Sequence, residues 1–389
     1  MVHSVILKSI RACNLRCTYC YYINEDTPEY GLTMSDACLE RVYASYAEYL
    51  HDNGARGSLV WHGGEPLMLG RPRLQRLLDL QRRFFAPGSI ENHLQTNGLL
   101  ITDEWIDFFK RNDVKVGLSL DGTKEVHDRF RVTKGGKGSY DLVIRAIERL
   151  RGHGIEVGVL TVMGSTPDGR RELMHLRDEL RIRGADFLFP ISSHALARRS
   201  PLDQKILSEF LLSAFQTWTE ADDSLFTVRL FRALIKNAMG MPHNYFASGA
   251  ASLGAAVIVE TDGKVCMDTD FSEIDRYDLG SEYRFDFSVM DEDFTFAKVD
   301  RALHARIEER QLDRIPADCQ SCRMRSVCRG AHPASRYDDR DHSFDHRSVY
   351  CEAMYDISDA VVEYLVRSGH GEDLADADLQ HDLRTAVPA

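Results

Sequence analysis

Three cysteines near the start of the chain constrain it most. Cys13, Cys17 and Cys20 lie within eight residues, in the spacing C-x3-C-x2-C. Thiolates are soft ligands that bind iron–sulfur clusters, zinc or copper(I), and this spacing lets three sulfur atoms converge on one centre. A cubane cluster with three protein thiolates keeps one iron atom open, so the spacing predicts a reactive cluster. A zinc site completed by a distant fourth residue is the alternative.

The composition predicts a cytoplasmic protein with metal chemistry. A chain of 389 residues with 43% hydrophobic residues can form one large barrel-like domain and a smaller one. No run approaches the ~18 apolar residues of a membrane span, and no signal peptide is evident. Nine cysteines then favour metal binding or catalysis over disulfides. The net charge of −12 disfavours nucleic acid as a partner and fits a small molecule or a peptide.

Short apolar runs alternate with amphipathic stretches along the first half of the chain. We expect strands over residues 4–10, 58–62, 90–95, 114–120, 157–162 and 187–189. We expect helices over residues 36–49 (with Ser35 as N-cap), 74–85, 103–111, 139–150, 170–183 and 206–220. This alternation predicts an α/β fold with a parallel sheet, either open or curled into a partial barrel.

Unusual residues follow successive strands of this predicted sheet. The cysteine triplet follows the first strand, and three further segments follow the next ones: Gly63-Gly64-Glu65-Pro66, Thr96-Asn97-Gly98 and Asp121-Gly122. The carboxyl ends of parallel strands form the active-site face of α/β barrels. Any one segment could be ordinary turn chemistry, but together they predict one site.

The cysteine spacing and the Gly63–Pro66 segment resemble the signature motifs of the radical SAM enzymes. The resemblance implies a partial (β/α)6 TIM-like barrel, with a [4Fe–4S] cluster on the three cysteines that binds S-adenosylmethionine (SAM). The implied SAM contacts are Gly63, Gly64, Glu65, Pro66, Asn97, Ser119, Asp121 and Arg131. Arg131 would bind the SAM carboxylate with its planar guanidinium, and a solvated surface charge is its alternative role.

A second cysteine group lies near the other end of the chain: Cys319, Cys322, Cys328 and Cys351. Four thiols can close a zinc site or a cluster, and their spacing does not separate the two. The group resembles the SPASM extension of radical SAM peptide maturases, which implies [4Fe–4S] ligation.

That extension normally holds two auxiliary clusters, and this chain departs from the pattern. Asp268 and His332 stand where the inner cluster would have cysteines, and Ser248, Gly249 and Ser252 occupy the upstream ligand region. We therefore expect one auxiliary cluster. An unusual inner metal site on Cys266, Asp268 and His332 is the alternative.

These features suggest a domain order. We expect a radical SAM core over 1–200, a helical bridge over 201–245, an auxiliary-cluster domain over 246–368 and a flexible acidic tail over 369–389. The auxiliary-cluster domain should begin with a β-hairpin that turns at Asp262-Gly263.

The segment from Cys328 to Cys351 looks most like the maturases that build cyclophane cross-links in ribosomal peptides (RiPPs). This resemblance implies an oxidoreductase that takes a β-carbon hydrogen from a precursor peptide and joins that carbon to an aromatic ring. Asp268 and Asp270 are the candidate proton acceptors, and a flavodoxin- or ferredoxin-type protein would supply electrons. Formylglycine formation, as in sulfatase maturases, is one alternative. A non-catalytic protein that recruits a peptide is the other.

Overall fold

The computed structural model describes residues 1–164, 166–243, 245, 253–276, 285, 287–376 and 379. The chain divides into two compact units. Unit 1 comprises Met1–Leu160, Gly254–Tyr277 and Tyr283–Arg306, and unit 2 comprises Thr161–Leu253, Asp278–Glu282 and Ile307–Ala389. Unit 1 thus takes residues from both the expected core and the expected auxiliary-cluster domain.

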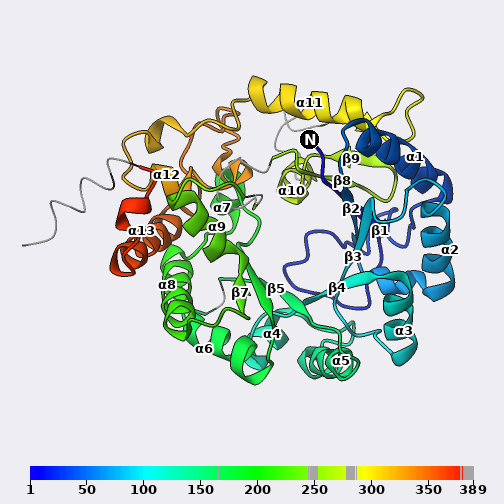
Figure 1. Ribbon diagram of the computed structural model, residues 1–389, viewed down its shortest axis with the longest axis horizontal. Coiled ribbons are helices and arrows are strands. Elements are labelled where there is room, and N and C mark those ends of the chain that lie inside the picture. Colours follow the sequence, from blue (N-terminus) through cyan, green and yellow to red (C-terminus); the bar gives the residue numbers. More distant parts are fainter. Residues whose placement is uncertain are drawn as a thin grey trace, which may run out of the picture. The chain divides into compact units, whose positions relative to one another are not determined.

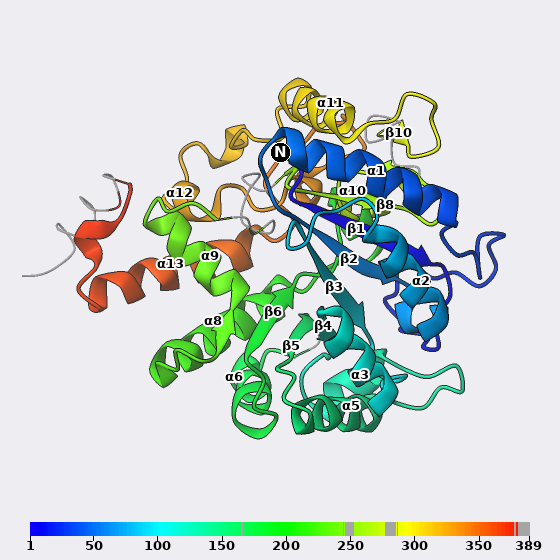
Figure 2. The ribbon, with the colours of Figure 1, turned by 45° about the vertical axis from the view of Figure 1, so that its right-hand side comes forward.

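Unit 1 is built on a parallel sheet that confirms the expected α/β fold. Its strands β1 to β5 pair in chain order, each parallel to the next. They span Ser4–Ile10, Gly57–Gly63, Ile90–Thr96, Val114–Ser119 and Gly158–Val162. The helices between them are α1 Asp36–Asp52, α2 Arg71–Gln81, α3 Asp103–Asn112, α4 Lys124–Phe130 and α5 Tyr140–Gly152. Helices α1, α2 and α3 lie side by side along one face of β1 to β4 (Figures 1 and 2).

Local sequence explains where these elements begin and which face they bury. Ser35 caps α1 as expected, because its hydroxyl accepts a hydrogen bond from the Cys38 N–H at 3.1 Å. Strand β2 alternates buried and half-buried residues, as a strand between a helical layer and a polar interior does. Helix α3 buries Trp105, Ile106, Phe108 and Phe109 on one face, which fixes it against the sheet.

The expected hairpin is present and extends the same sheet. Strand β8 (Ala256–Val259) pairs antiparallel with β9 (Lys264–Cys266), and Gly263 takes a φ of +93° in the turn. Strand β8 also pairs in parallel with β1, and β10 (Phe287–Ser288) pairs with β9. Helices α10 (Thr269–Arg276) and α11 (Phe296–Glu309) follow the hairpin.

Unit 2 contains the rest of the βα pattern and a helical group. Strand β6 pairs in parallel with β7, and helix α13 packs against α8, α9 and α12 (Figure 2). The elements are α6 Gly169–Met174, β6 Gly184–Leu188, α7 His194–Arg199, α8 Gln204–Ala221, β7 Thr227–Val228, α9 Arg229–Ala238, α12 Arg325–Cys328 and α13 Cys351–Arg367.

Two expectations in this region need adjustment. The helix expected over 170–183 is shorter, because α6 passes into a π-turn at His175–Glu179 and Arg181 then takes a left-handed φ of +51°. The sixth strand begins at Gly184 rather than Phe187. Its residues Ala185, Asp186 and Phe187 are all buried, so the strand lacks the alternation of buried and exposed residues that would mark its start in the sequence.

Some predictions fall on residues outside the described parts of the chain. Ser248, Gly249 and Ser252, which stand in the upstream ligand region, lie there, as does most of the expected acidic tail. Within the described residues, no helix is long and apolar enough to cross a membrane.

Candidate active site at the strand ends of unit 1

The cysteine loop leaves β1 and is held by backbone hydrogen bonds to the segment after β4. The Arg16 N–H donates to the Val132 carbonyl at 2.8 Å, and the Thr18 N–H donates to the Phe130 carbonyl at 2.9 Å. These bonds fix the loop on both sides of Cys17. The three cysteines are therefore presented by a braced loop rather than by a helix or strand.

The three thiols of this loop are a chemically suitable donor set for a cluster. Cys13 and Cys17 are half-buried, and loss of hydration raises their pKa values to about 12 and about 11; the Arg131 guanidinium opposes this shift at Cys17. The charges of Cys17 and Cys20 also act on Cys13. The Cys13 sulfur accepts a hydrogen bond from the Leu15 N–H at 3.4 Å, and the Cys20 sulfur accepts one from the Ile23 N–H at 3.4 Å. Hydrogen bonds to sulfur are one means of tuning a cluster.

These thiols do not form a site for a single ion in the described part of the chain. Among the residues that the structure describes, no three His, Cys, Asp or Glu side chains lie close enough to share a single ion. A cubane binds each thiolate through a different iron atom, so its ligand sulfurs stand farther apart than those of a tetrahedral zinc.

Gly63 and Gly64 are required by the approach of the cysteine loop itself. A Cβ on Gly64 would lie 2.0 Å from the Ala12 carbonyl oxygen, and one on Gly63 would lie 2.5 Å from that of Ile10. The backbones are joined there, because the N–H groups of Gly64 and Glu65 donate to Ile10 and Ala12 at 2.8 and 2.9 Å. The two glycines thus let the end of β2 hold the start of the cysteine loop.

Glu65 is fully buried and held by three donors. Its Oε1 accepts from the Leu67 N–H at 3.0 Å and the Thr96 hydroxyl at 2.7 Å, and its Oε2 accepts from the Asn97 N–H at 2.9 Å. Burial outweighs these bonds and raises the pKa of Glu65 to about 7. The Asn97 side chain reaches the cysteine loop, donating to the Asn14 side-chain oxygen at 2.7 Å and to the Cys13 sulfur at 3.7 Å.

A buried ion pair lies beside Cys17. Arg131 binds the Asp121 carboxylate with two hydrogen bonds, and Tyr19 donates to the same carboxylate. The guanidinium also lies over the Tyr19 ring at 5.5 Å. Arg131 is therefore a buried, oriented cation at the strand ends, so the alternative of a solvated surface charge is wrong.

His127 and Ser139 brace this ion pair from behind. The Asp121 N–H donates to His127 Nδ1 at 3.3 Å, so the proton of the neutral ring lies on Nε2 and is donated to the Ser139 hydroxyl at 2.9 Å. The Ser139 hydroxyl in turn donates to the Arg131 carbonyl at 2.7 Å. Burial, assisted by the Arg131 charge, lowers the pKa of His127 to about 4, which keeps the ring neutral.

The other expected residues of unit 1 occupy defined positions. Ser119, at the end of β4, accepts a hydrogen bond from the Gln95 side chain at 3.0 Å. Pro66 begins a 3-10 turn that is capped by Glu65. Asp268 caps helix α10, because its Oδ1 accepts from the Phe271 N–H at 2.9 Å. Asp270 lies in the first turn of α10 and is half-buried.

Three of the four cysteines of unit 2 lie at the ends of helical segments. Cys319 ends the 3-10 turn Ala317–Cys319, Cys328 ends α12 and Cys351 begins α13. The charges of Cys322 and Cys351 act on Cys319, and the charge of Cys322 also acts on Cys351. Burial raises the pKa of Cys328 to about 12, and the charges of Cys319 and Cys351 act in the same direction. Four soft thiols of one unit that act on one another are a chemically suitable donor set for a cluster. His332 is buried in the same unit, whereas Cys266 and Asp268 belong to unit 1.

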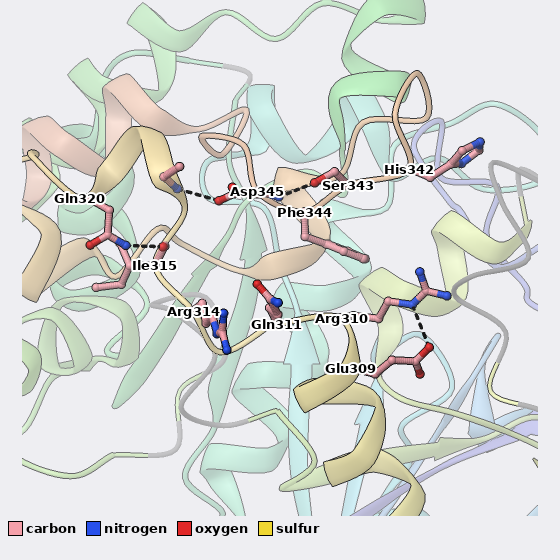
Figure 3. A pocket seen from close by; sticks show the side chains of 11 residues that line it. Glu309, Arg310, Gln311, Arg314, Ile315, Gln320, His342, Ser343, Phe344 and Asp345 are labelled. Carbon is pink, nitrogen blue, oxygen red and sulfur yellow. Dashed lines mark hydrogen bonds and ion pairs between the residues drawn. The ribbon is translucent and has the colours of Figure 1, made fainter.

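A cavity of about 450 Å³ in unit 2 adjoins the Cys319 turn (Figure 3). Two hydrogen bonds hold the segments that line the cavity in place. The Ala317 N–H donates to Asp345 at 2.6 Å, and the Gln320 amide donates to the Ile315 carbonyl at 2.7 Å. Two arginines, Arg310 and Arg314, share the lining with Glu309 and Asp345. The formal charges of these four side chains balance, so the cavity has no strong preference for an anion or a cation.

The family model of the radical SAM superfamily matches residues 7–180. This segment contains the three cysteines, the two glycines, Glu65 and the Asp121–Arg131 pair described above. Residues 7–180 are a radical SAM domain. The chain accordingly carries a radical SAM domain, and enzymes with this domain use SAM.

The similarity to known enzymes extends well beyond this domain. The chain is 27% identical to the serine-type anaerobic sulfatase-maturating enzyme of Bacteroides thetaiotaomicron, over 93% of this chain and 90% of that one. It is 27% identical to the cysteine-type anaerobic sulfatase-maturating enzyme of Clostridium novyi, over 82% and 84%.

Solved structures confirm the fold. Native anSMEcpe with bound AdoMet superposes with a TM-score of 0.76 and 22% identity, covering 100% of both chains. The structure of the same protein with AdoMet and the Cp18Cys peptide gives a TM-score of 0.75, covering 96% of this chain and 99% of that one.

The cyclophane prediction is wrong. It relied on a short segment around Cys328 and Cys351 and on the missing inner-cluster thiols. The relatives that match over most of the chain are named sulfatase-maturating enzymes. They favour the alternative interpretation, formylglycine formation as in sulfatase maturases. A local likeness within one module does not outweigh similarity along nearly the whole chain.

The roles of two functional neighbours were not found from the sequence. Tyr19 and His127 contact the Asp121–Arg131 pair. Tyr19 lies inside the cysteine motif and His127 lies four residues before Arg131, so position beside a motif was the available signal. The sequence did not show the contact of His127 with Ser139 across the α4–α5 turn.

Proposed function

We propose that this enzyme oxidises a seryl or cysteinyl residue of a polypeptide to formylglycine. The observation that carries the proposal is the match to serine-type and cysteine-type sulfatase-maturating enzymes over most of the chain. The site at the strand ends of unit 1 supports the proposal, because its cysteine loop is braced and its Glu65 and Asp121 carboxylates are buried in fixed positions.

The reaction balances without an external oxidant, because one SAM molecule is consumed and takes up the two electrons that the side chain loses. When bound, SAM and the reduced cluster supply the 5′-deoxyadenosyl radical that removes one β-carbon hydrogen atom. A seryl side chain then loses a proton and an electron to become the aldehyde. A cysteinyl side chain becomes a thioaldehyde in the same way, and water then exchanges its sulfur for oxygen with release of hydrogen sulfide. The cycle takes up one electron at the start and releases one electron at the end. The products are therefore formylglycine, methionine and 5′-deoxyadenosine.

The residues of this chain would hold, orient and shield the reactants. Cys13, Cys17 and Cys20 would bind the SAM cluster, and Glu65 and Arg131 would face the amino and carboxylate groups of SAM. Glu65 is already aligned by its three donors and Arg131 by Asp121. Such fixed groups need little rearrangement when the cofactor binds.

The released proton and electron need acceptors. We propose Asp268 as proton acceptor, with its carboxylate orientation set by the cap on α10, and Asp270 as the alternative. The four-thiol module would accept the electron. A flavodoxin- or ferredoxin-type protein would supply the first electron.

The test is anaerobic turnover of peptides from the active-site segment of a sulfatase, with Ser, Cys or Ala at the modified position. We expect the Ser peptide to lose two hydrogens, the Cys peptide to exchange its thiol for a carbonyl oxygen, and the Ala peptide to stay unchanged. Deuterium on the β-carbon should appear in 5′-deoxyadenosine. Formation of 5′-deoxyadenosine with no aldehyde in either the Ser or the Cys peptide would contradict the proposal.

A further inference from the structure

Lys8 is a charged side chain buried inside unit 1. It lies on β1 and is 1% exposed. Its Nζ donates to the Tyr21 hydroxyl at 3.0 Å and lies over the rings of Tyr21 and Tyr22 at 5.2 and 4.8 Å. Burial opposes its charged form, yet the interactions with Tyr21 and Glu260 outweigh this and raise the pKa of Lys8. Lys8 is therefore a permanent buried cation.

Arg11 is a second cation in the same place. Its Nη2 lies 3.4 Å from Glu260 Oε2, and its guanidinium lies 4.7 Å from the Tyr22 ring centre. Its Nε is buried and has no hydrogen-bond partner among the described residues. Glu260, which follows β8, accepts on its other oxygen from the Ser272 hydroxyl at 3.3 Å.

Positive charge exceeds negative charge in this cluster of side chains. Lys8 and Arg11 share one buried carboxylate, Glu260, and no carboxylate of the described residues lies within ion-pair distance of Lys8. Glu29 also acts on Arg11, but it is exposed and screened by water. His62, beside Lys8 in the β1–β2 register, is neutral because burial, and then Lys8, lower its pKa to about 3.

A buried charge without a partner is unfavourable, so this surplus calls for a nearby anion. The cysteine loop is adjacent along the chain and would supply one when it holds a cluster. Tyr21, which binds Lys8, directly follows Cys20, and Arg11 stands two residues before Cys13. Three thiolates on a cubane give an anionic site, and reduction adds one more negative charge.

We propose that Lys8 and Arg11 are positioning charges that stabilise the reduced form of the SAM cluster and so raise its reduction potential. Glu260 partly offsets them. This role is separate from formylglycine formation, because it concerns only how readily the cluster takes its electron. Net charge near a cluster is a known determinant of its potential.

The test is a potentiometric titration of the anaerobically reconstituted enzyme, followed by electron paramagnetic resonance. The signal that changes when SAM is added reports the SAM cluster and separates it from an auxiliary one. At the midpoint potential of the native SAM cluster, we expect Lys8→Met to lower the ratio of reduced to oxidised cluster about tenfold. This corresponds to a shift of about 59 mV in the midpoint potential for one electron. Lys8→Arg keeps the charge and should stay within about twofold of native.

Variants that remove positive and negative charge should change the ratio of reduced to oxidised cluster in opposite directions, which distinguishes an effect of charge from an effect of lost packing. Glu260→Gln removes the offsetting carboxylate and should raise the ratio, whereas Arg11→Met should lower it, as Lys8→Met does. Lys115→Met removes an exposed lysine that pairs with Glu91 on the same sheet and should leave the ratio unchanged. A native ratio in both Lys8→Met and Arg11→Met, or a fall in Glu260→Gln, would overturn the proposal. If Lys8→Met does not fold, the Arg11 and Glu260 variants decide.

Discussion

Arg131 binds both carboxylate oxygens of Asp121, with Nε 2.9 Å from Oδ2 and Nη2 3.1 Å from Oδ1. Both side chains are nearly removed from water, with exposed fractions of 11% and 1%. A bidentate pair of this kind fixes the plane of the guanidinium. The cation beside Cys17 therefore has a set orientation before any cofactor binds.

Breaking this pair should destabilise the protein strongly. Asp121→Asn leaves the Arg131 charge buried without a counter-ion, and we expect a loss of ~3–5 kcal/mol in the free energy of unfolding, measured with denaturant. Asp141→Asn is the matched control, because Asp141 is exposed and pairs with Lys124 at the surface; it should change stability by less than about 1 kcal/mol. Equal effects of the two substitutions would contradict a buried role for the pair.

Replacing Gly64 by alanine should expel the SAM cluster. The added Cβ would meet the Ala12 carbonyl oxygen at 2.0 Å, so the backbone that carries Cys13 must move away. We expect the loss of about four irons per chain and a destabilisation of at least about 1–3 kcal/mol. Gly152→Ala, on α5 with no atom near its new Cβ, should retain its iron. A Gly64→Ala protein with full iron content would refute this account of the glycine.

The stability of the metal-free chain should depend on Glu65. The pKa of its carboxyl is about 7 when folded, against 4.5 as the ordinary value. The folded chain thus keeps a proton that the unfolded chain has released, and its stability falls as pH rises from about 4.5 through about 7, by about 3 kcal/mol in total.

Denaturant unfolding of the native chain and of Glu65→Gln across this pH range checks the predicted direction of the change in stability. The variant cannot ionise, so the native-minus-variant stability should decrease as pH rises. Glu148→Gln, on the exposed side of α5, serves as control and should show no such change. A difference that is constant or that increases with pH would show that Glu65 is ionised in the folded chain.

Iron counting tests the two cysteine groups separately. We expect about eight irons per chain after anaerobic reconstitution, and about four in a Cys13→Ala/Cys17→Ala/Cys20→Ala variant. Cys38→Ala removes a buried thiol of α1 and should keep all the iron. About twelve irons would indicate that the inner auxiliary site is occupied, and zinc in place of half the iron would make the unit 2 module structural.

Much of the site was predictable because its signals are local. The spacing of Cys13, Cys17 and Cys20 predicted a cluster, and the strand–helix rhythm placed the segments that begin at Gly63, Thr96 and Asp121 at one edge of the sheet. The Ser35 cap was predictable for the same reason, since a cap involves residues only three apart. The choice between cyclophane formation and formylglycine formation was not, because it depended on similarity over the whole chain.

The sequence by itself determined the ligand types, the element order and the parallel α/β class, all of which depend on short-range patterns of residues. Only the tertiary structure decided what these residues contact. The two glycines serve the cysteine loop, β8 joins β1, and Arg11 meets Glu260 although they are 249 residues apart. Such partners are chosen by the path of the chain and by the need to compensate buried charge, and neither is visible in a local pattern.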